Sequence, residues 1–259
     1  MRHAGWLLTL LVAGAAGCAR KQEAPRRTEP WLASASASSS PAPRGILELH
    51  FSPESQIRFS LPARKAKLVG QVPLAEGKLR LDPKNLQASQ ASISADLTRI
   101  AISDDSLPTG GDAPPGSPSA LALNWLELGP DVPAQQRTQF SLARFELVSL
   151  ENLSKASLDL DASARKTPVR ATAVGTLLVH GYRAPVRAEV VLELLPPSAA
   201  QPARLSIRST TPLVLPLAPH DIVARGASGM LDPLQTARAA DVVGKNARIE
   251  LQLVAEASK

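Results

Sequence analysis

Two alternating apolar segments between residues 169 and 194 constrain the fold of this chain more than any other feature. Apolar side chains fall on odd positions in the first segment and on even positions in the second. Because strand side chains alternate between the two faces of a sheet, each segment has one apolar face. The stretch around Gly181 and Pro185 is typical of a hairpin connection. We therefore predict two antiparallel neighbours whose apolar residues are Val169, Ala171, Ala173, Leu177, Val179, Val186, Ala188, Val190, Leu192 and Leu194.

The same period of two recurs in shorter segments on both sides of this hairpin. In each of them apolar side chains alternate with polar or charged ones, which is typical of half-buried antiparallel strands. About eight such strands can close into a barrel, and closure removes their unpaired edges. Further strands are therefore predicted at residues 56–61, 78–82, 92–98, 205–208 and 248–253.

Two segments depart from this alternation. Residues 118–126 lack a strict period of two and begin with a proline and a serine, which predicts one short helix. Between Phe140 and Leu147 the apolar positions change from even to odd. A β-bulge near Ala143-Arg144 would account for this change and would bend the strand.

The many alanines and valines on the apolar faces leave two interpretations open. If they face the inside of a barrel, they leave a dry space that suits an apolar chain. The alternative is a solid core. Trp125, on the predicted helix, is expected either to cap one mouth of the barrel or to pack in its core. The candidate lumen residues are Phe59, Leu81, Ile93, Leu97, Trp125, Phe140, Leu142, Leu177, Val179, Val190, Leu192 and Leu251.

Residues 1–18 have the pattern of a secretory signal. A basic start is followed by an apolar run too short to span a membrane and by small residues up to Cys18, the only cysteine of the chain. This position resembles the bacterial lipobox, in which the cysteine is lipidated after cleavage. We therefore expect an exported protein, anchored by lipid on the periplasmic side of the cell envelope. Ala19 follows the cysteine, which resembles lipoproteins sorted to the outer membrane. An ordinary secreted protein is the alternative.

The charge of the chain is concentrated near this anchor. Residues 19–45 are rich in serine, alanine and proline, hold five basic and two acidic residues, and predict a disordered tether. A basic tether favours the anionic headgroups of a membrane surface. Residues 46–259 form one predicted β domain with 23 basic and 21 acidic residues. Because this domain has no basic stripe interleaved with aromatic residues, we do not expect it to bind nucleic acid.

The histidines do not form a catalytic or metal-binding pattern. His50, His180 and His220 are far apart in the sequence, so the spacing of a zinc site is missing. Adjacent strand residues point to opposite faces, which makes the pair His220 and Asp221 a poor catalytic dyad. His180 is interpreted as a turn residue that hydrogen-bonds to the backbone rather than as a ligand. We expect neither an enzyme nor a metal protein.

Several stretches, taken in order, resemble the YceI-like family, a lipocalin-like family associated with polyisoprenoid binding. The most similar stretch is the hairpin from Gly175 to Val186, which follows the family pattern G-x-L-x-x-H-G-x-x-x-P-V. The resemblance covers most of residues 50–255. Its other matching stretches are Ser55–Ser60, Leu68–Gly70, Gly77–Pro83, Ala91–Leu97 and Thr138–Phe140, the last of them taken as a strand.

The resemblance implies an all-β fold, an eight-stranded antiparallel barrel with a long isoprenoid or similar lipid tail in its lumen. A polyisoprenoid or an isoprenoid quinone is the kind of ligand it implies, and no other cofactor is expected. The leading interpretation is thus a non-catalytic protein that binds an apolar lipid. The alternative is a structural or interaction module of the cell envelope with a filled barrel and no ligand.

Overall fold

The structure is a computed structural model of the chain. It describes residues 26–27, 45–62, 67–103, 117–158, 167–195, 202–231 and 244–257. The predicted signal peptide, Cys18 and most of the predicted tether lie outside the described residues. Within the predicted tether, Arg26 and Arg27 pair with Arg183 and Tyr182 as the short strand β1.

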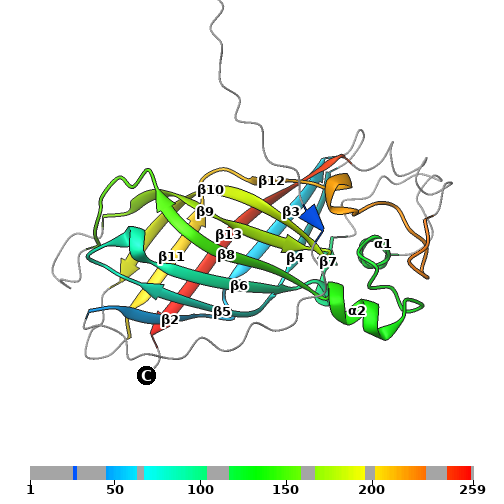
Figure 1. Cartoon of the computed structure of the whole chain (residues 1–259), viewed down its shortest axis with the longest axis horizontal. Coiled ribbons are helices and arrows are strands. Elements are labelled where there is room, and N and C mark those ends of the chain that lie inside the picture. Colours follow the sequence, from blue (N-terminus) through cyan, green and yellow to red (C-terminus); the bar gives the residue numbers. More distant parts are fainter. Residues whose placement is uncertain are drawn as a thin grey trace, which may run out of the picture.

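Eight antiparallel strands form a closed ring, as the sequence predicted (Figure 1). Hydrogen-bonded neighbours follow the order β10, β9, β8, β6, β5, β2, β13 and β11, and β11 pairs again with β10. This arrangement is an all-β, lipocalin-like barrel. The strands are β1 (Arg26–Arg27), β2 (Leu47–Phe51), β3 (Gln56–Pro62), β4 (Lys67–Val72), β5 (Leu74–Leu81), β6 (Gln90–Asp96), β7 (Ala101–Ile102), β8 (Leu142–Glu151), β9 (Val169–Val179), β10 (Tyr182–Leu195), β11 (Arg204–Ser209), β12 (Leu213–Pro216) and β13 (Asn246–Ala257).

The long C-terminal strand β13 joins the two ends of the barrel. On one side it pairs with β2 and then with β3, and on the other side with β11 and then with β12. The strands β3 and β4 form a hairpin, and β7 continues the wall beside β4. The wall of the barrel therefore extends beyond the short strands β2 and β12, and β13 pairs with the strands at both ends of the barrel.

The hairpin predicted at residues 169–194 is confirmed as β9 and β10. Its turn is tighter than expected and consists of His180 and Gly181, both at positive φ, at 50° and 78°. This is the geometry of a two-residue type I′ turn, whose twist matches that of the flanking strands. Pro185, which was expected in the connection, lies within β10 opposite Thr176.

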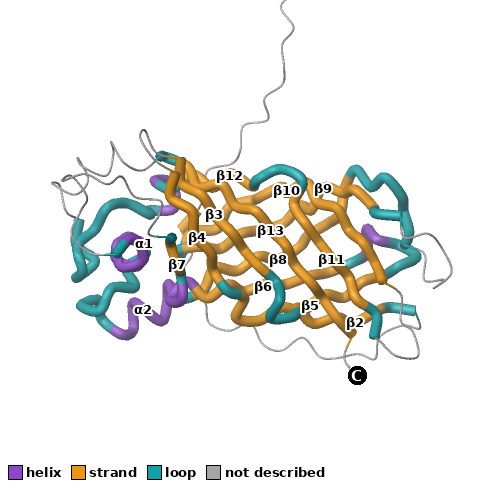
Figure 2. Tube along the Cα trace, turned by 180° about the vertical axis from the view of Figure 1, so that it is seen from behind, coloured by secondary structure: helices purple, strands orange, loops and turns teal. Residues whose placement is uncertain are grey.

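The described residues include two α-helices, where the sequence predicted one, and both lie at the same end of the barrel (Figures 1 and 2). The predicted helix is confirmed as α1, and the Ser117 hydroxyl caps it by accepting a bond from the Ala120 N–H. The second helix, α2, was not predicted. Described 3₁₀ turns lie at Leu86–Ala88 (η1), Leu97–Arg99 (η2) and Ala218–His220 (η4), and the α-helices are α1 (Pro118–Trp125) and α2 (Ala134–Phe140). None of the described helices is long and apolar enough to cross a bilayer.

The helix α2 corrects two expectations about the same segment. The predicted strand at Thr138–Phe140 is wrong, because Pro133 and the good helix formers after it start a helix that ends at Phe140. The predicted bulge at Ala143-Arg144 is also wrong, since both residues pair regularly with β6. The register shift lies between Leu147 and Ser149, facing β9. The apparent change of phase was the junction between helix and strand.

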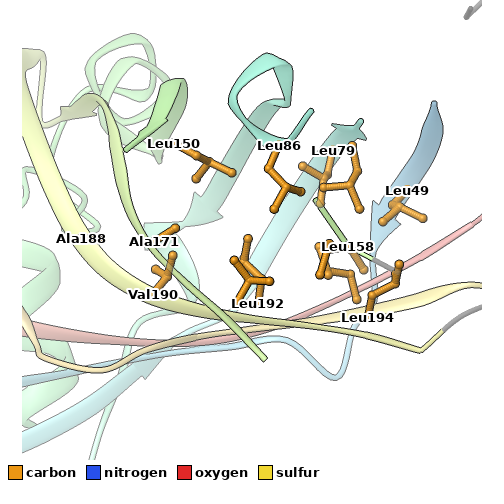
Figure 3. Close-up of a cluster of buried hydrophobic side chains, with 14 residues drawn as sticks. Leu49, Leu79, Leu86, Leu150, Leu158, Ala171, Ala188, Val190, Leu192 and Leu194 are labelled. Carbon is orange, nitrogen blue, oxygen red and sulfur yellow. The ribbon is translucent and has the colours of Figure 1, made fainter. Parts of the chain in front are cut away.

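The core consists of two clusters, one at each end of the barrel. The first gathers leucines from several strands around Leu86 of η1, at the end opposite the helices (Figure 3). Leu81, Leu86 and Leu205 are fully buried in it. The second cluster joins α1, α2 and the segment around Ile222 to the barrel. Both ends of the barrel therefore hold a cluster of packed apolar side chains.

Candidate ligand-binding cavity

A cavity of about 250 Å³ lies inside the barrel. Its surface is made of apolar atoms, although Ser89 and Arg144 border it. The cavity exceeds the roughly 150 Å³ space that can hold one benzene molecule. It is below the range of about 300 to 1,000 Å³ that is usual for drug-sized ligands. Its size therefore suits part of one hydrocarbon chain rather than a bulky lipid.

Much of the cavity exists because the side chains that line it are short alanines. A larger side chain at any of these positions would project into the lumen and fill it. The interior thus contains two clusters of packed apolar side chains and a hollow that residues of both clusters line, which combines the two interpretations left open by the sequence. The alanines in the lining are Ala91, Ala95, Ala122, Ala143, Ala173, Ala188 and Ala247.

Ten of the twelve candidate lumen residues lie in the lining of this cavity. Their side chains come from six strands, from η2 and from α1, which contributes Trp125. That these residues bind a ligand stays a prediction. The ten are Phe59, Leu81, Ile93, Leu97, Trp125, Leu177, Val179, Val190, Leu192 and Leu251.

The other two candidates, Phe140 and Leu142, lie outside the lining. Phe140 ends α2, and its ring packs against the ring of His180 with centroids 4.4 Å apart. On β8 the alternating lining residues Ala143, Phe145 and Leu147 put Leu142 on the opposite face, although Arg144 and Leu150 also border the cavity. Both were misplaced because the strand was assumed to begin before residue 140.

Many lining residues were not among the candidates. Eight of them stand two positions away from a candidate on the same strand, as Ile57 does from Phe59 and Ile249 from Leu251. The alternation of apolar residues with a period of two could therefore have identified these residues. The lining residues Leu213, Leu215 and Leu217 also follow a period of two, over a short segment, whereas Ile222 lies after a 3₁₀ turn and carries no such signal.

Two phenylalanine rings lie over glycines of the neighbouring strand. The ring of Phe59 covers its cross-strand partner Gly70, and the ring of Phe51 covers Gly77. A Cβ atom at either glycine would overlap the ring. Glycine in a strand commonly marks such a close approach. Both phenylalanines also line the cavity. The glycines thus let the rings lie against the wall and keep the lumen open.

We expect Gly77→Ala to reduce the affinity for apolar ligands by about tenfold, since overpacking costs about 1 to 3 kcal/mol when ring and ligand compete for one space. At Gly77 the three nearest atoms all belong to the Phe51 ring, so the ring is what must move. The measurement is a ligand titration of the variant and of the double variant Gly77→Ala/Phe51→Leu. The smaller side chain should restore binding, and an unrestored double variant would contradict this explanation.

A second, polar pocket of about 340 Å³ lies at the helical end. Its lining includes Glu127, Gln136, His180, Tyr182 and Asp221. The loop after α1, the helix α2, the hairpin between β9 and β10 and the residue after η4 bring these residues together. Sequence analysis did not predict this pocket. It did place His180 in a turn with a backbone hydrogen bond, and the structure confirms both.

A network of charges and hydrogen bonds holds this pocket. The guanidinium of Arg225 lies 3.0 Å from Glu127 Oε1 and 2.9 Å from Asp221 Oδ2, and it also donates to the carbonyl of Gly229. Gln136 donates to the other oxygen of Glu127. Because Glu127 and Arg225 are nearly buried, the pair depends on these contacts, and loss of one partner would leave an unpaired buried charge.

Burial lowers the pKa of His180 and the pKa of His220 below 6.5, the ordinary value for histidine. For His180 the hydrogen bond to the His220 carbonyl and the charges of Glu127 and Asp221 act in the opposite direction, but burial outweighs them. Arg225 adds to the lowering. Both rings are thus neutral in the folded protein at neutral pH.

These shifts predict that the protein loses stability in mild acid. In the unfolded chain the two histidines take up protons below about pH 6.5, whereas in the folded protein they resist protonation. The free energy of unfolding should therefore fall as the pH drops from about 6.5 towards the lower, folded pKa values. Urea denaturation at several pH values measures this. The slope should diminish in His180→Asn and stay unchanged in the control His50→Asn, whose side chain is exposed.

Within the described residues no group of three histidine, cysteine, aspartate or glutamate side chains is placed to hold a metal ion.

Among known proteins, no family model and no curated protein matches the chain. It is similar to a solved structure of a polyisoprenoid binding domain from Saccharophagus degradans implicated in plant cell wall breakdown, at 15% identity and a TM-score of 0.48. That match covers 82% of this chain and 99% of the other.

The chain is also similar to BcnA of Burkholderia cenocepacia, at 12% identity and a TM-score of 0.47, over 78% of this chain and 96% of that one.

Proposed function

We propose that this protein binds the apolar tail of a polyisoprenoid or a similar lipid in the lumen of its barrel, without catalysing a reaction. The observation that carries the proposal is the cavity of about 250 Å³ with an entirely apolar surface. Burial of hydrocarbon in such a space contributes about 25 cal/mol for each Å² removed from water. The apolar surface offers no hydrogen bond that would select a polar ligand.

The cavity also counts against the alternative of a filled barrel that serves only as a structural module. A folded domain normally packs its interior to the density of an organic crystal. Here the lining alanines and the glycines under Phe51 and Phe59 keep a space open in the middle of the barrel. An unfilled space costs stability, and a bound tail would offset that cost.

Export and anchoring through Cys18 belong to the same proposal. They are supported by the signal pattern of residues 1–18 and by the basic composition of residues 19–45. A lipid anchor would hold the barrel close to a membrane, which is the source of apolar lipids. Replacing Cys18 by serine in the full chain should move the protein from the membrane fraction to the soluble fraction. Continued membrane association of the variant would refute the anchor.

The test of lipid binding starts from the full chain purified with a mild detergent. Organic extraction followed by mass spectrometry should release about one isoprenoid or similar lipid per chain. After delipidation, a titration with farnesol should change the fluorescence of Trp125, which lines the cavity. The variant Trp125→Phe removes this signal and separates it from the other tryptophans. The proposal fails if no lipid co-purifies and farnesol changes neither fluorescence nor thermal stability.

A further inference from the structure

The polar pocket lies directly behind the wall of the apolar cavity. In three pairs of adjacent residues, one member lines the apolar cavity and the other lines the polar pocket. The wall between the two spaces is therefore about one residue thick. The pairs are Leu126 and Glu127, Val179 and His180, and Ile222 and Asp221.

The ring of His180 presents an unused hydrogen-bond acceptor to this pocket. Its Nδ1 lies 3.0 Å from the carbonyl oxygen of His220, and a carbonyl only accepts, so Nδ1 carries the proton. In the neutral ring Nε2 then carries a lone pair and can accept a hydrogen bond. His180 is only 2% exposed, and Nε2 has no hydrogen-bond donor among the described residues. A buried acceptor of this kind favours a ligand that brings a donor.

Charge at the pocket favours a donor that is a cation. Among the described residues, the carboxylates of Glu127 and Asp221 in the lining pair with one guanidinium, that of Arg225, which lies next to the lining. With His180 neutral, the cluster carries one excess negative charge. Glu127 Oε1 lies 3.7 Å from His180 Nε2, so one small donor can reach both atoms. The aromatic ring of Tyr182, in the lining, also suits a cation.

The backbone around the pocket is strained where its functional side chains are attached. Three of the four described non-glycine residues with positive φ belong to the pocket, namely Glu127, His180 and Asp221. Such residues cluster at sites where the surrounding structure fixes them for a function. Asparagine is the favoured residue at the first position of a type I′ turn, and histidine is also enriched at positive φ, so the turn accommodates His180 and points its ring at the pocket.

We propose that this pocket is a binding site for a primary ammonium group, which donates to His180 Nε2 and to the carboxylate of Glu127 or Asp221. The site goes beyond the binding of an apolar tail in the lumen. The ammonium group can belong to a free small amine or to the head of an amine-bearing lipid at the same end of the barrel. Exposed Gln135 and Gln139 in the lining leave the pocket open to solvent for either source.

The test uses the full chain labelled with ¹⁵N-histidine at about pH 7.5, where the amine is charged and His180 is neutral. Ethylammonium chloride is the probe. Because its three heavy atoms limit its affinity, we expect a Kd of about 1 mM. Binding should shift the ¹⁵N resonance of His180 Nε2 in the direction of an accepted hydrogen bond. Ethanol and tetramethylammonium, which lack the charge or the donor, should bind at least tenfold more weakly.

Matched variants separate the contributions of the two side chains. His180→Asn keeps a residue suited to the turn and should weaken ethylammonium binding at least tenfold, as measured by calorimetry. Asp221→Asn should weaken ethylammonium but leave ethanol unaffected, which would identify the role of charge. His50→Asn, an exposed control, should bind as the wild type does. Ethylammonium that leaves the His180 resonance unshifted well above 1 mM, or that binds His180→Asn equally well, overturns the site.

Dodecylamine distinguishes the two sources of the ammonium group. If the group is a lipid head, dodecylamine should bind more tightly than ethylammonium, and blocking the lumen with Leu177→Arg should abolish that gain. If the group comes from a free amine, the two probes should bind equally and Leu177→Arg should affect neither. In both cases ethylammonium binds to Leu177→Arg, so failure of lipid binding in the lumen does not count as failure of this site.

Discussion

Replacing Leu177 by arginine should abolish the binding of apolar ligands, with a loss of at least a hundredfold in affinity. Leu177 lines the cavity from β9, between Phe145 on β8 and Ala184 on β10. An arginine there places a charge without a partner in an apolar space, which costs about 3 to 5 kcal/mol. Farnesol titration of the delipidated variant measures the effect.

The neighbouring leucine provides a matched control. Leu178 is the next residue of β9 and lies outside the lining, on the other face of the strand. Leu178→Arg makes the same chemical change and should leave farnesol binding within about twofold of the wild type. Far-UV circular dichroism of both variants checks that they fold.

A third variant covers the case in which Leu177→Arg unfolds the barrel. Ala188→Phe adds bulk to the lumen without a charge. It should weaken binding at least tenfold. The lumen hypothesis is refuted if Leu178→Arg loses binding as much as Leu177→Arg, or if both luminal variants still bind farnesol normally.

Replacing Leu86 by alanine should cost about 2 to 5 kcal/mol of stability and lengthen the cavity. Leu86 is fully buried in the cluster at the end opposite the helices, where η1 holds it, and its N–H donates to the carbonyl of Ala156 (Figure 3). A truncated leucine in a packed core loses transfer free energy and leaves a void. Since the cluster lies at the end of the lumen, the void should extend the space available to a tail.

Two measurements test this prediction. Urea denaturation gives the loss of stability, and Val148→Ala, at a position that is 69% exposed, should change stability by less than about 0.5 kcal/mol. Titration with geranylgeraniol, which is one isoprene unit longer than farnesol, gives the preference for chain length. That preference should rise in Leu86→Ala relative to the wild type. An unchanged ratio of the two affinities would mean that the cluster does not limit the length of the tail.

The strands of the barrel could be predicted because their pattern is local. In β9, β10 and β13 nearly every second residue is apolar, so the face of most residues follows from their position in the chain. The error at Phe140 and Leu142 arose where alternation was assumed across a junction between helix and strand. The fault lay in the assumed start of the strand, since β8 alternates regularly from Ala143 to Leu147.

The alternating pattern by itself determined that the sheet has one apolar face and enough strands to close, because side-chain direction in a strand depends only on position. Whether the enclosed space is full was decided by tertiary structure. The ring of Phe51 over Gly77, the leucine cluster around Leu86 and the pairing of β13 with β2 all join residues distant in the sequence. The same holds for the polar pocket, where Glu127, His180 and Arg225 come from three separate loops and meet only because the barrel closes.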